Sequence, residues 1–230
     1  MAPTFDFTSD PTLSSFAVNL ETFVANDPGR KTSSGATIRF QYVAVGAIVF
    51  DSSSDPERVL LVQRAATDSA PNRWEVPGGA TDFEDPSILH SVARELWEES
   101  GLTGETIGPR VGDGDVFLTR SGKLVCKFHF LVEAKRNSNG ALNVVLDPKE
   151  HQNYLWATEE EVKARRVGDV DLKFTTKEQE VAIIKGFEAR RRMKGVKSNY
   201  RYNATSPQDF TQTRCDINDT TYRRKALAMS

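Results

Sequence analysis

The feature that most restricts the fold is a stretch from Phe40 to Phe50 that is rich in Val, Tyr, Phe and Ile. It breaks at the polar segment 51–56, which ends in proline, and the apolar pattern resumes at residues 59–62. Runs of β-branched and aromatic residues on either side of Ser, Asp and Pro are typical of two strands joined by a turn. We therefore expect two strands here, and we expect further strands at 124–132, 142–146 and 154–156.

A helix is expected between the second and third of these strands. Asp85 and Pro86 suit a helix N-cap followed by proline at the first position, and Gly101 suits the C-terminal end. The apolar residues between them recur at helical spacing: Ile88, Leu89, Val92, Ala93 and Leu96. Strands mixed with helices predict an α/β or α+β fold built from packed layers.

The two ends of the chain differ from this centre. Near the start, Phe16, Leu20, Phe23 and Val24 predict one short amphipathic helix in an accessory extension at residues 1–38. After about Arg192 the apolar period stops, which predicts a domain at residues 39–193 and a disordered tail at 194–230.

Two helices are expected to close the domain. Capping-box patterns occur at residues 158–161 and 175–178. The second pattern precedes Val181, Ile184 and Phe187, which would lie on one side of the helix that it opens.

Composition narrows the classes of function. The chain of 230 residues has 30 Lys and Arg against 32 Asp and Glu, so its overall charge does not favour a general nucleic-acid or membrane-surface binder. Its two cysteines, Cys126 and Cys215, suggest neither a disulfide framework nor a Cys-rich metal site. No stretch resembles a signal peptide or a membrane span. We therefore expect a cytoplasmic protein whose affinity for phosphates resides in a local site.

The chemistry is indicated by three glutamates in the last turn of the central helix. At about 100° per residue, Glu95 lies between Glu98 and Glu99 on the helix wheel, so the three carboxylates share one arc. They repel one another and face the negative end of the helix dipole, which a helix selected only for stability would avoid. A hard divalent cation such as Mg²⁺ or Mn²⁺ would relieve this conflict. The alternative is a solvated acidic face, which is the usual state of a charge run.

The segment from Gly79 to Leu102 resembles the Nudix box, G-x5-E-x7-R-E-U-x-E-E-x-G-U, where U is an apolar residue. The second half matches at every fixed position from Arg94 onward, and the preceding Trp74-Glu-Val-Pro-Gly-Gly79 is also similar to the family. The resemblance covers about residues 40–192 and is greatest to fungal members. It implies an α/β/α sandwich around a mixed sheet.

One departure from the box affects its first acidic position. Counting forward from Gly79 places this position on Asp85, but eight residues then separate it from Arg94, where the pattern has seven. The loop therefore carries one extra residue, and either Asp85 or Glu84 supplies the accessory carboxylate. Asp85 is also open to a purely structural role as the helix N-cap.

The resemblance assigns roles to the residues that match the box. It implies that Glu98 and Glu99 are the principal metal ligands, and that Glu95 ligates a metal or orients and deprotonates water. The carbonyl of Gly79 would complete the site, and Arg94 would hold one of the glutamates.

Other candidates are weaker. Glu150 and His151 lie in a loop where the family often places an extra acidic ligand or a base, although such a pair is more often only solvated. For substrate binding we consider Arg64, which would contact a phosphate or form a salt bridge at the end of a strand, and Trp74, which would stack on a base or pack in the core. His129 lies on a strand and is expected to be structural, while the basic run 190–194 is expected to be solvated.

The implied activity is metal-dependent hydrolysis of a diphosphate in a nucleoside diphosphate linked to another moiety, with Mg²⁺ or Mn²⁺ as cofactor. The alternatives are a hydrolase of isoprenoid or inositol diphosphates, and a catalytically silent binding module with the same fold. The expected partner is a small-molecule diphosphate, without nucleic acid or membrane. The N-terminal helix would either cover the pocket or contribute to a homodimer.

Overall fold

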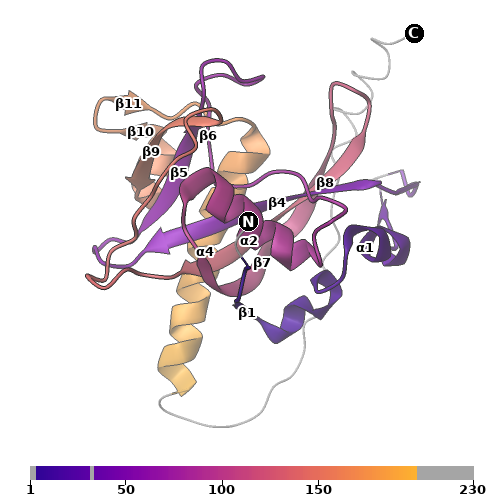
Figure 1. The fold of residues 1–230 in the computed structure, drawn as a ribbon, viewed down its shortest axis with the longest axis horizontal. Coiled ribbons are helices and arrows are strands. Elements are labelled where there is room, and N and C mark those ends of the chain that lie inside the picture. Colours follow the sequence, from indigo (N-terminus) through magenta and orange to yellow (C-terminus); the bar gives the residue numbers. More distant parts are fainter. Residues whose placement is uncertain (1–3, 32–33, 201–230) are drawn as a thin grey trace.

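The computed structural model describes residues 4–31 and 34–200 of the chain. A seven-stranded mixed sheet forms its centre, with strand order β1-β7-β8-β4-β5-β6 and with β9 paired to β5 (Figure 1). The strands are β1 Thr8–Ser9, β4 Tyr42–Asp51, β5 Arg58–Arg64, β6 Trp74–Glu75, β7 Gly104–Leu118, β8 Leu124–Ala134 and β9 His151–Ala157. β4 is parallel to β8, whereas β7 with β8, and β5 with each of β4, β6 and β9, are antiparallel.

Helices cover both faces of this sheet. They are the 3-10 helix η1 Pro11–Phe16, α1 Leu20–Asn26, α2 Ile88–Ser100, α3 Glu159–Ala164 and α4 Lys177–Tyr200. Two small pairs complete the elements: β2 Arg30–Lys31 with β3 Thr37–Ile38, and β10 Arg166–Val167 with β11 Val170–Asp171. The predicted α+β fold with a mixed sheet between helices is confirmed.

Alternation along β4 divides the core into two halves. Val45 and Val49 pack in one cluster of buried residues, which includes apolar side chains of η1, α1 and α2. Ile48 and Phe50 belong to the other cluster, to which α3 and α4 contribute. Successive strand residues face opposite sides of a sheet. Because β4 is apolar at consecutive positions, both of its faces can pack against a layer of helices.

The N-terminal segment is divided where the sequence predicts one continuous helix. η1 ends at Phe16, and Asn19 caps α1 by accepting a hydrogen bond from the backbone N–H of Thr22 at 3.0 Å. The ring of Phe16 lies 5.1 Å from that of Phe128 and 5.2 Å from that of Phe130, between ring centroids. This segment therefore supplies core side chains to the α2 face of the sheet.

One prediction of local structure is wrong, and one strand was missed. Residues 142–146 form no strand, and the backbone N–H of Val145 instead donates to the carbonyl of Ser100 at the end of α2, at 2.8 Å. β7 was not predicted, because its Gly and Pro residues interrupt the apolar pattern. Three irregularities in its pairing with β8 accommodate these residues.

The closing helices agree with the sequence in part. Thr158 and Glu161 form the predicted capping box of α3. At α4 it is Thr176, not Thr175, whose hydroxyl accepts a backbone N–H, from Gln179 at 3.0 Å, and Val181 is exposed rather than part of the buried side.

α4 continues to Tyr200, into the predicted tail, and the remainder of that tail lies outside the described residues. Among the described helices, none combines the length and apolar character needed to cross a bilayer.

Candidate active site

Helix α2 fixes the position of the three glutamates. Ile88, Val92 and Leu96 are fully buried, and Gly101 ends the helix in a left-handed conformation with φ of 68°. This orientation buries Glu99, which is 5% exposed, and leaves Glu98 at the surface. The N-cap is Ser87, whose side chain accepts a hydrogen bond from the backbone of His90. The prediction that Asp85 caps the helix, with Pro86 at its first position, is therefore wrong.

A glycine turn packs directly against two of these carboxylates. The backbone N–H of Gly78, which has φ of 154°, donates to Oε2 of Glu99 at 2.6 Å. A Cβ at Gly79 would lie 2.6 Å from a carboxylate oxygen of Glu95. A Cβ at Gly78 would lie 2.2 Å from the backbone carbonyl oxygen of Val45, so only glycine fits at that position. The carbonyl of Gly79, predicted as a metal ligand, accepts the backbone N–H of Val45 at 2.8 Å, so one of its two lone pairs is already used.

Arg94 gathers three carboxylates into what we call the Arg94 cluster, formed by Arg94, Asp85, Glu95 and Glu98. Its guanidinium donates to Glu95 and Glu98 at 2.8 Å each, and to Asp85 through Nε at 3.0 Å and through Nη2 at 2.8 Å. It also donates to the carbonyl of Ala80 at 2.9 Å. Such charge-assisted, forked bonds orient a carboxylate more strictly than single neutral ones.

The members of the Arg94 cluster differ in acidity. Burial raises the pKa of Glu95 to about 7, against the opposing effect of Arg94. Burial also disfavours the charged form of Asp85, but hydrogen bonds from Arg94 outweigh it and lower the pKa of Asp85. Glu95 is therefore the member of this cluster whose protonation changes near neutral pH, which suits a group that exchanges a proton with water.

The structure separates the two candidates for the accessory carboxylate. Asp85 is 8% exposed and binds Arg94, whereas Glu84 is exposed to solvent. The extra residue of the loop thus does not displace Asp85 from the Arg94 cluster.

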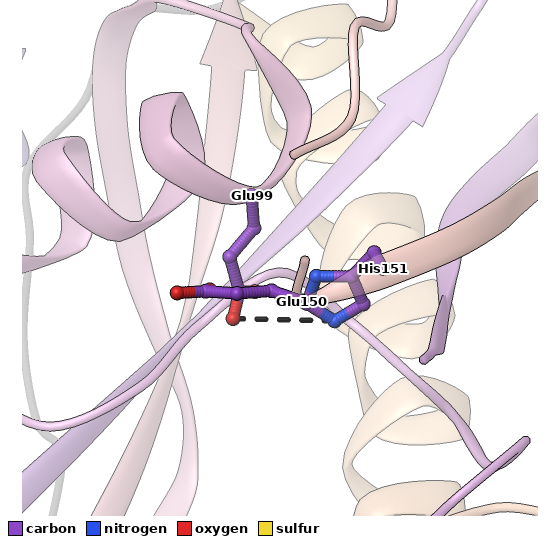
Figure 2. Close-up of side chains that lie close together, drawn as sticks. All are labelled: Glu99, Glu150 and His151. Atoms are coloured by element: carbon purple, nitrogen blue, oxygen red, sulfur yellow. Dashed lines mark ion pairs between the residues drawn. The ribbon is translucent and has the colours of Figure 1, made fainter. Parts of the chain in front are cut away.

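A second group, which we call the His151 cluster, contains Glu99, Glu150 and His151. One donor atom from each of the three lies within 4.8 Å of those of the other two (Figure 2). Glu99 comes from α2, His151 from the start of β9 and Glu150 from the loop before it, so only the folded chain brings them together. Burial and the charge of Glu75 raise the pKa of Glu99 well above its ordinary value.

Glu75, which sequence reasoning did not assign to the site, lies beside the His151 cluster. It is 3% exposed on β6, and Oε1 of its carboxylate lies 3.7 Å from Nε2 of His151. Burial opposes its ionisation, but His151, Lys127 and Arg64 together lower the pKa of Glu75. The sequence feature that could have indicated Glu75 is its position between the apolar residues Trp74 and Val76.

Arg64 forms the salt bridge that the sequence offered as an alternative to phosphate binding. Its guanidinium binds Asp68 through Nε at 2.8 Å and through Nη2 at 2.7 Å, and it donates to Glu75 through Nη1. In the structure its role is to neutralise Glu75.

The base-stacking role considered for Trp74 is not compatible with its position. Trp74 is 1% exposed and packs in the core on the α4 side of the sheet, so it presents no free ring face. The exposed aromatic residue beside the site is Trp97, at 39% exposure. It lines a groove of about 610 Å³ with the neighbouring residues Glu98, Gly101, Val145, Leu146, Asp147 and Glu150.

His129 has the structural position expected from the sequence. It is 2% exposed on β8, and burial lowers its pKa to about 3. It therefore stays neutral and adds no charge to the site.

The His151 cluster has donors that fit a divalent cation. It offers two carboxylates and an imidazole, and within residues 4–31 and 34–200 no Lys or Arg forms an ion pair with Glu99 or Glu150. Both ring nitrogens of the buried His151 lack a hydrogen-bond partner. These ring nitrogens are therefore available to a cation, and together with the two carboxylates they fit the metal implied by the Nudix resemblance.

Comparisons with known proteins identify the family of this chain. The NUDIX domain family matches residues 41–177. The m7GpppN-mRNA hydrolases NUDT17 of Homo sapiens and Bos taurus are 49% and 46% identical to this chain over 61 residues, which is 26% of this chain. The match spans only 18% and 20% of those proteins.

A solved C. elegans Ap4A hydrolase binary complex has a similar fold, with a TM-score of 0.50 and 23% identity. The likeness covers 66% of this chain and 98% of that chain.

Proposed function

The chain belongs to the NUDIX domain family, and from this membership we propose that it is a divalent-metal-dependent hydrolase of a diphosphate linkage in a nucleoside diphosphate joined to another moiety. The observation that carries the proposal is the convergence of Glu99, Glu150 and His151, without an ion-pairing Lys or Arg in the described part of the chain, beside Glu98 and Glu95. All three glutamates of the helix are present, which favours an enzyme over a silent binding module.

The chain's residues divide the work of the reaction. Glu98, Glu99 and Glu150 would hold the cation, Mg²⁺ or Mn²⁺. When bound, such a cation activates water and neutralises charge on phosphate oxygens. Glu95, with a pKa of about 7, accepts the proton as the water oxygen bonds to phosphorus and the bridging P–O bond breaks. Arg94 orients Glu95 for this transfer.

The groove beside α2 gives the organic part of the substrate a place to bind. Trp97 presents an exposed ring next to Glu98, and Val145 adds an apolar wall. A nucleobase stacked on Trp97 would keep its diphosphate near Glu98 and Glu150. The names of the NUDT17 relatives, which refer to a nucleotide cap, support a nucleotide substrate over an isoprenoid or inositol diphosphate.

We propose a small molecule rather than a long RNA as the substrate. The basic run at the end of α4 is engaged in ion pairs: Arg190 binds Glu57 and Glu133, Arg191 binds Glu159 and Lys194 binds Glu57. These pairs reduce the positive charge available to a phosphate backbone.

A hydrolysis panel tests the proposal. The protein is incubated with Mg²⁺ or Mn²⁺ and with a nucleoside diphosphate sugar, a dinucleoside tetraphosphate, a cap dinucleotide, a capped RNA and an isoprenoid diphosphate. We expect cleavage of at least one nucleotide at its phosphate chain, loss of cleavage with a chelator, and loss in Glu99→Gln. Cleavage of the isoprenoid diphosphate alone would favour the alternative, and no metal-dependent cleavage of any compound would refute the proposal.

A further inference from the structure

His151 is the most unusual polar side chain near the site. It is 2% exposed, and neither Nδ1 nor Nε2 has a hydrogen-bond partner. A buried imidazole whose nearest carboxylate oxygen, Oε1 of Glu75, lies 3.7 Å away has lost its short hydrogen bonds to water without equal replacement, which destabilises the fold unless another ligand compensates. The position of this side chain therefore calls for an explanation beyond packing.

The backbone of β9 aims this ring inward. His151 pairs with Arg64 of β5, whereas Asn153 pairs with Gln63, so the register shifts at Gln152. The side chain of Gln152 is held outside by Asn72, to whose Oδ1 it donates at 2.7 Å. Bulges redirect the neighbouring side chains of a strand, and here the result is an imidazole that faces α2.

The ring faces two carboxylates, but it forms a hydrogen bond with neither. Nε2 lies 3.7 Å from Oε1 of Glu75 and 4.0 Å from Oε1 of Glu99. Glu75 already accepts a hydrogen bond from Arg64, which reduces its need for a second cationic partner. The separation from Glu99 is one that a single ion can span, because metal bonds of about 2.1 Å to each atom reach about 4.2 Å.

We propose that His151 supplies a nitrogen ligand, beside Glu99 and Glu150, to the divalent cation of this site. The inference rests on the proposed metal-dependent function and specifies the chemistry of its metal. Mg²⁺ strongly prefers oxygen ligands, whereas imidazole favours first-row transition metals such as Co²⁺ and Zn²⁺. A mixed set of two carboxylates and one imidazole therefore shifts the selectivity of the site away from Mg²⁺.

Pulsed EPR on the full chain loaded with Mn²⁺ tests the ligand directly. We expect a nitrogen coupling to the Mn²⁺ electron spin in the wild type, a changed pattern when the histidines carry ¹⁵N, and no coupling in His151→Gln. His90→Gln is the matched control, because His90 lies at the other end of α2 and bonds to Ser87. The isotope experiment needs no substitution, so the test remains decisive if His151→Gln fails to fold.

Calorimetric titration tests the selectivity without any turnover. Loss of a nitrogen ligand should weaken Co²⁺ binding about tenfold or more in His151→Gln, but Mg²⁺ binding only about threefold or less. Mn²⁺ binding without nitrogen coupling, or equal losses for both metals, would overturn this inference and leave the proposed function intact. Failure of the wild type to bind any of these metals would overturn both.

Discussion

The Arg94 cluster and the His151 cluster both draw glutamates from helix α2, yet their charges are compensated in different ways. In the first, one guanidinium binds Asp85, Glu95 and Glu98. In the second, Glu99 and Glu150 lie beside a buried imidazole, and no Lys or Arg in the described residues forms an ion pair with them. The first group carries its own counter-ion, whereas the described residues supply none to the second, as its proposed role in metal binding requires.

Under the proposed function, this difference separates two tasks that the sequence places in one acidic turn. A neutralised cluster holds its carboxylates in fixed orientations, as a proton acceptor requires. A cluster without a counter-charge keeps its oxygen atoms available for a cation. Glu98 lies between these roles, because it is exposed, lines the groove and is bound by Arg94.

Glu98→Gln is expected to have the largest effect and shows whether the two clusters act together. If Glu98 leaves Arg94 to ligate the cation, turnover should fall by about 10³-fold, because a misplaced metal loses several kcal/mol of transition-state stabilisation. The stability of the metal-free protein should change little, since the lost ion pair is exposed. Melting temperature with and without Mn²⁺, measured beside turnover, checks this. A fully active variant would show that Glu98 does not ligate the cation and belongs only to the Arg94 cluster.

Arg94→Gln should reveal how strongly the first cluster depends on its counter-ion. Asp85 is buried and Arg94 is the main cation that compensates its charge, so we expect a loss of about 3–5 kcal/mol in unfolding free energy. Arg58→Gln, which breaks a more exposed pair with Glu161, should cost about 1 kcal/mol or less. Urea denaturation measures the unfolding free energy of both variants. Equal losses would show that Arg94 contributes no more to stability than a surface ion pair does.

The sequence predicts the Arg94 cluster better than the His151 cluster, for a physical reason. Arg94, Glu95 and Glu98 lie within two turns of one helix, so helical spacing alone places them together. Glu99 follows them on the same helix and is 5% exposed. Its contact with His151 depends on the pairing of β5 with β9, and on a register shift that no sequence period reveals.

The same reasoning explains the errors in the fold. β4, β5, β8 and α2 have strong apolar periods, and each was expected near its observed place. β7 contains Gly112 and Gly114 at positive φ, so its strand character is established by pairing with β8 rather than by local preference. The sequence alone leaves base stacking open for Trp74, because its burial results from the packing of a helix layer against the sheet.

The pH dependence of stability should also distinguish the clusters. The folded pKa of Glu95 is about 7, above its ordinary value of 4.5, so the native protein binds the extra proton between these values. The free energy of unfolding of the metal-free protein should therefore fall as pH rises from 5 to 7, by about 2 kcal/mol from Glu95 alone.

Glu99 adds to this fall, because its pKa is also raised. Glu95→Gln should reduce the fall in unfolding free energy between pH 5 and 7. Saturating Mn²⁺ should also reduce this fall, because a cation favours the charged carboxylates. Urea denaturation at pH 5, 6 and 7 with a chelator measures this slope. Stability of the metal-free protein that rises over this range would contradict the burial of the acidic groups.

The smallest effects are expected in the loop before α2, where Asp85→Asn and Glu84→Gln sharpen the boundary of the Arg94 cluster. Asp85 is buried and accepts bonds from Nε and Nη2 of Arg94, so its amide replacement should cost about 1–3 kcal/mol and lower turnover modestly by loosening Glu95. Glu84 is exposed, and its replacement should change stability by less than about 0.5 kcal/mol. A Glu84→Gln variant that loses activity while Asp85→Asn retains it would reverse the assignment, and would mean that the extra loop residue lets Glu84 reach the site when substrate or cation binds.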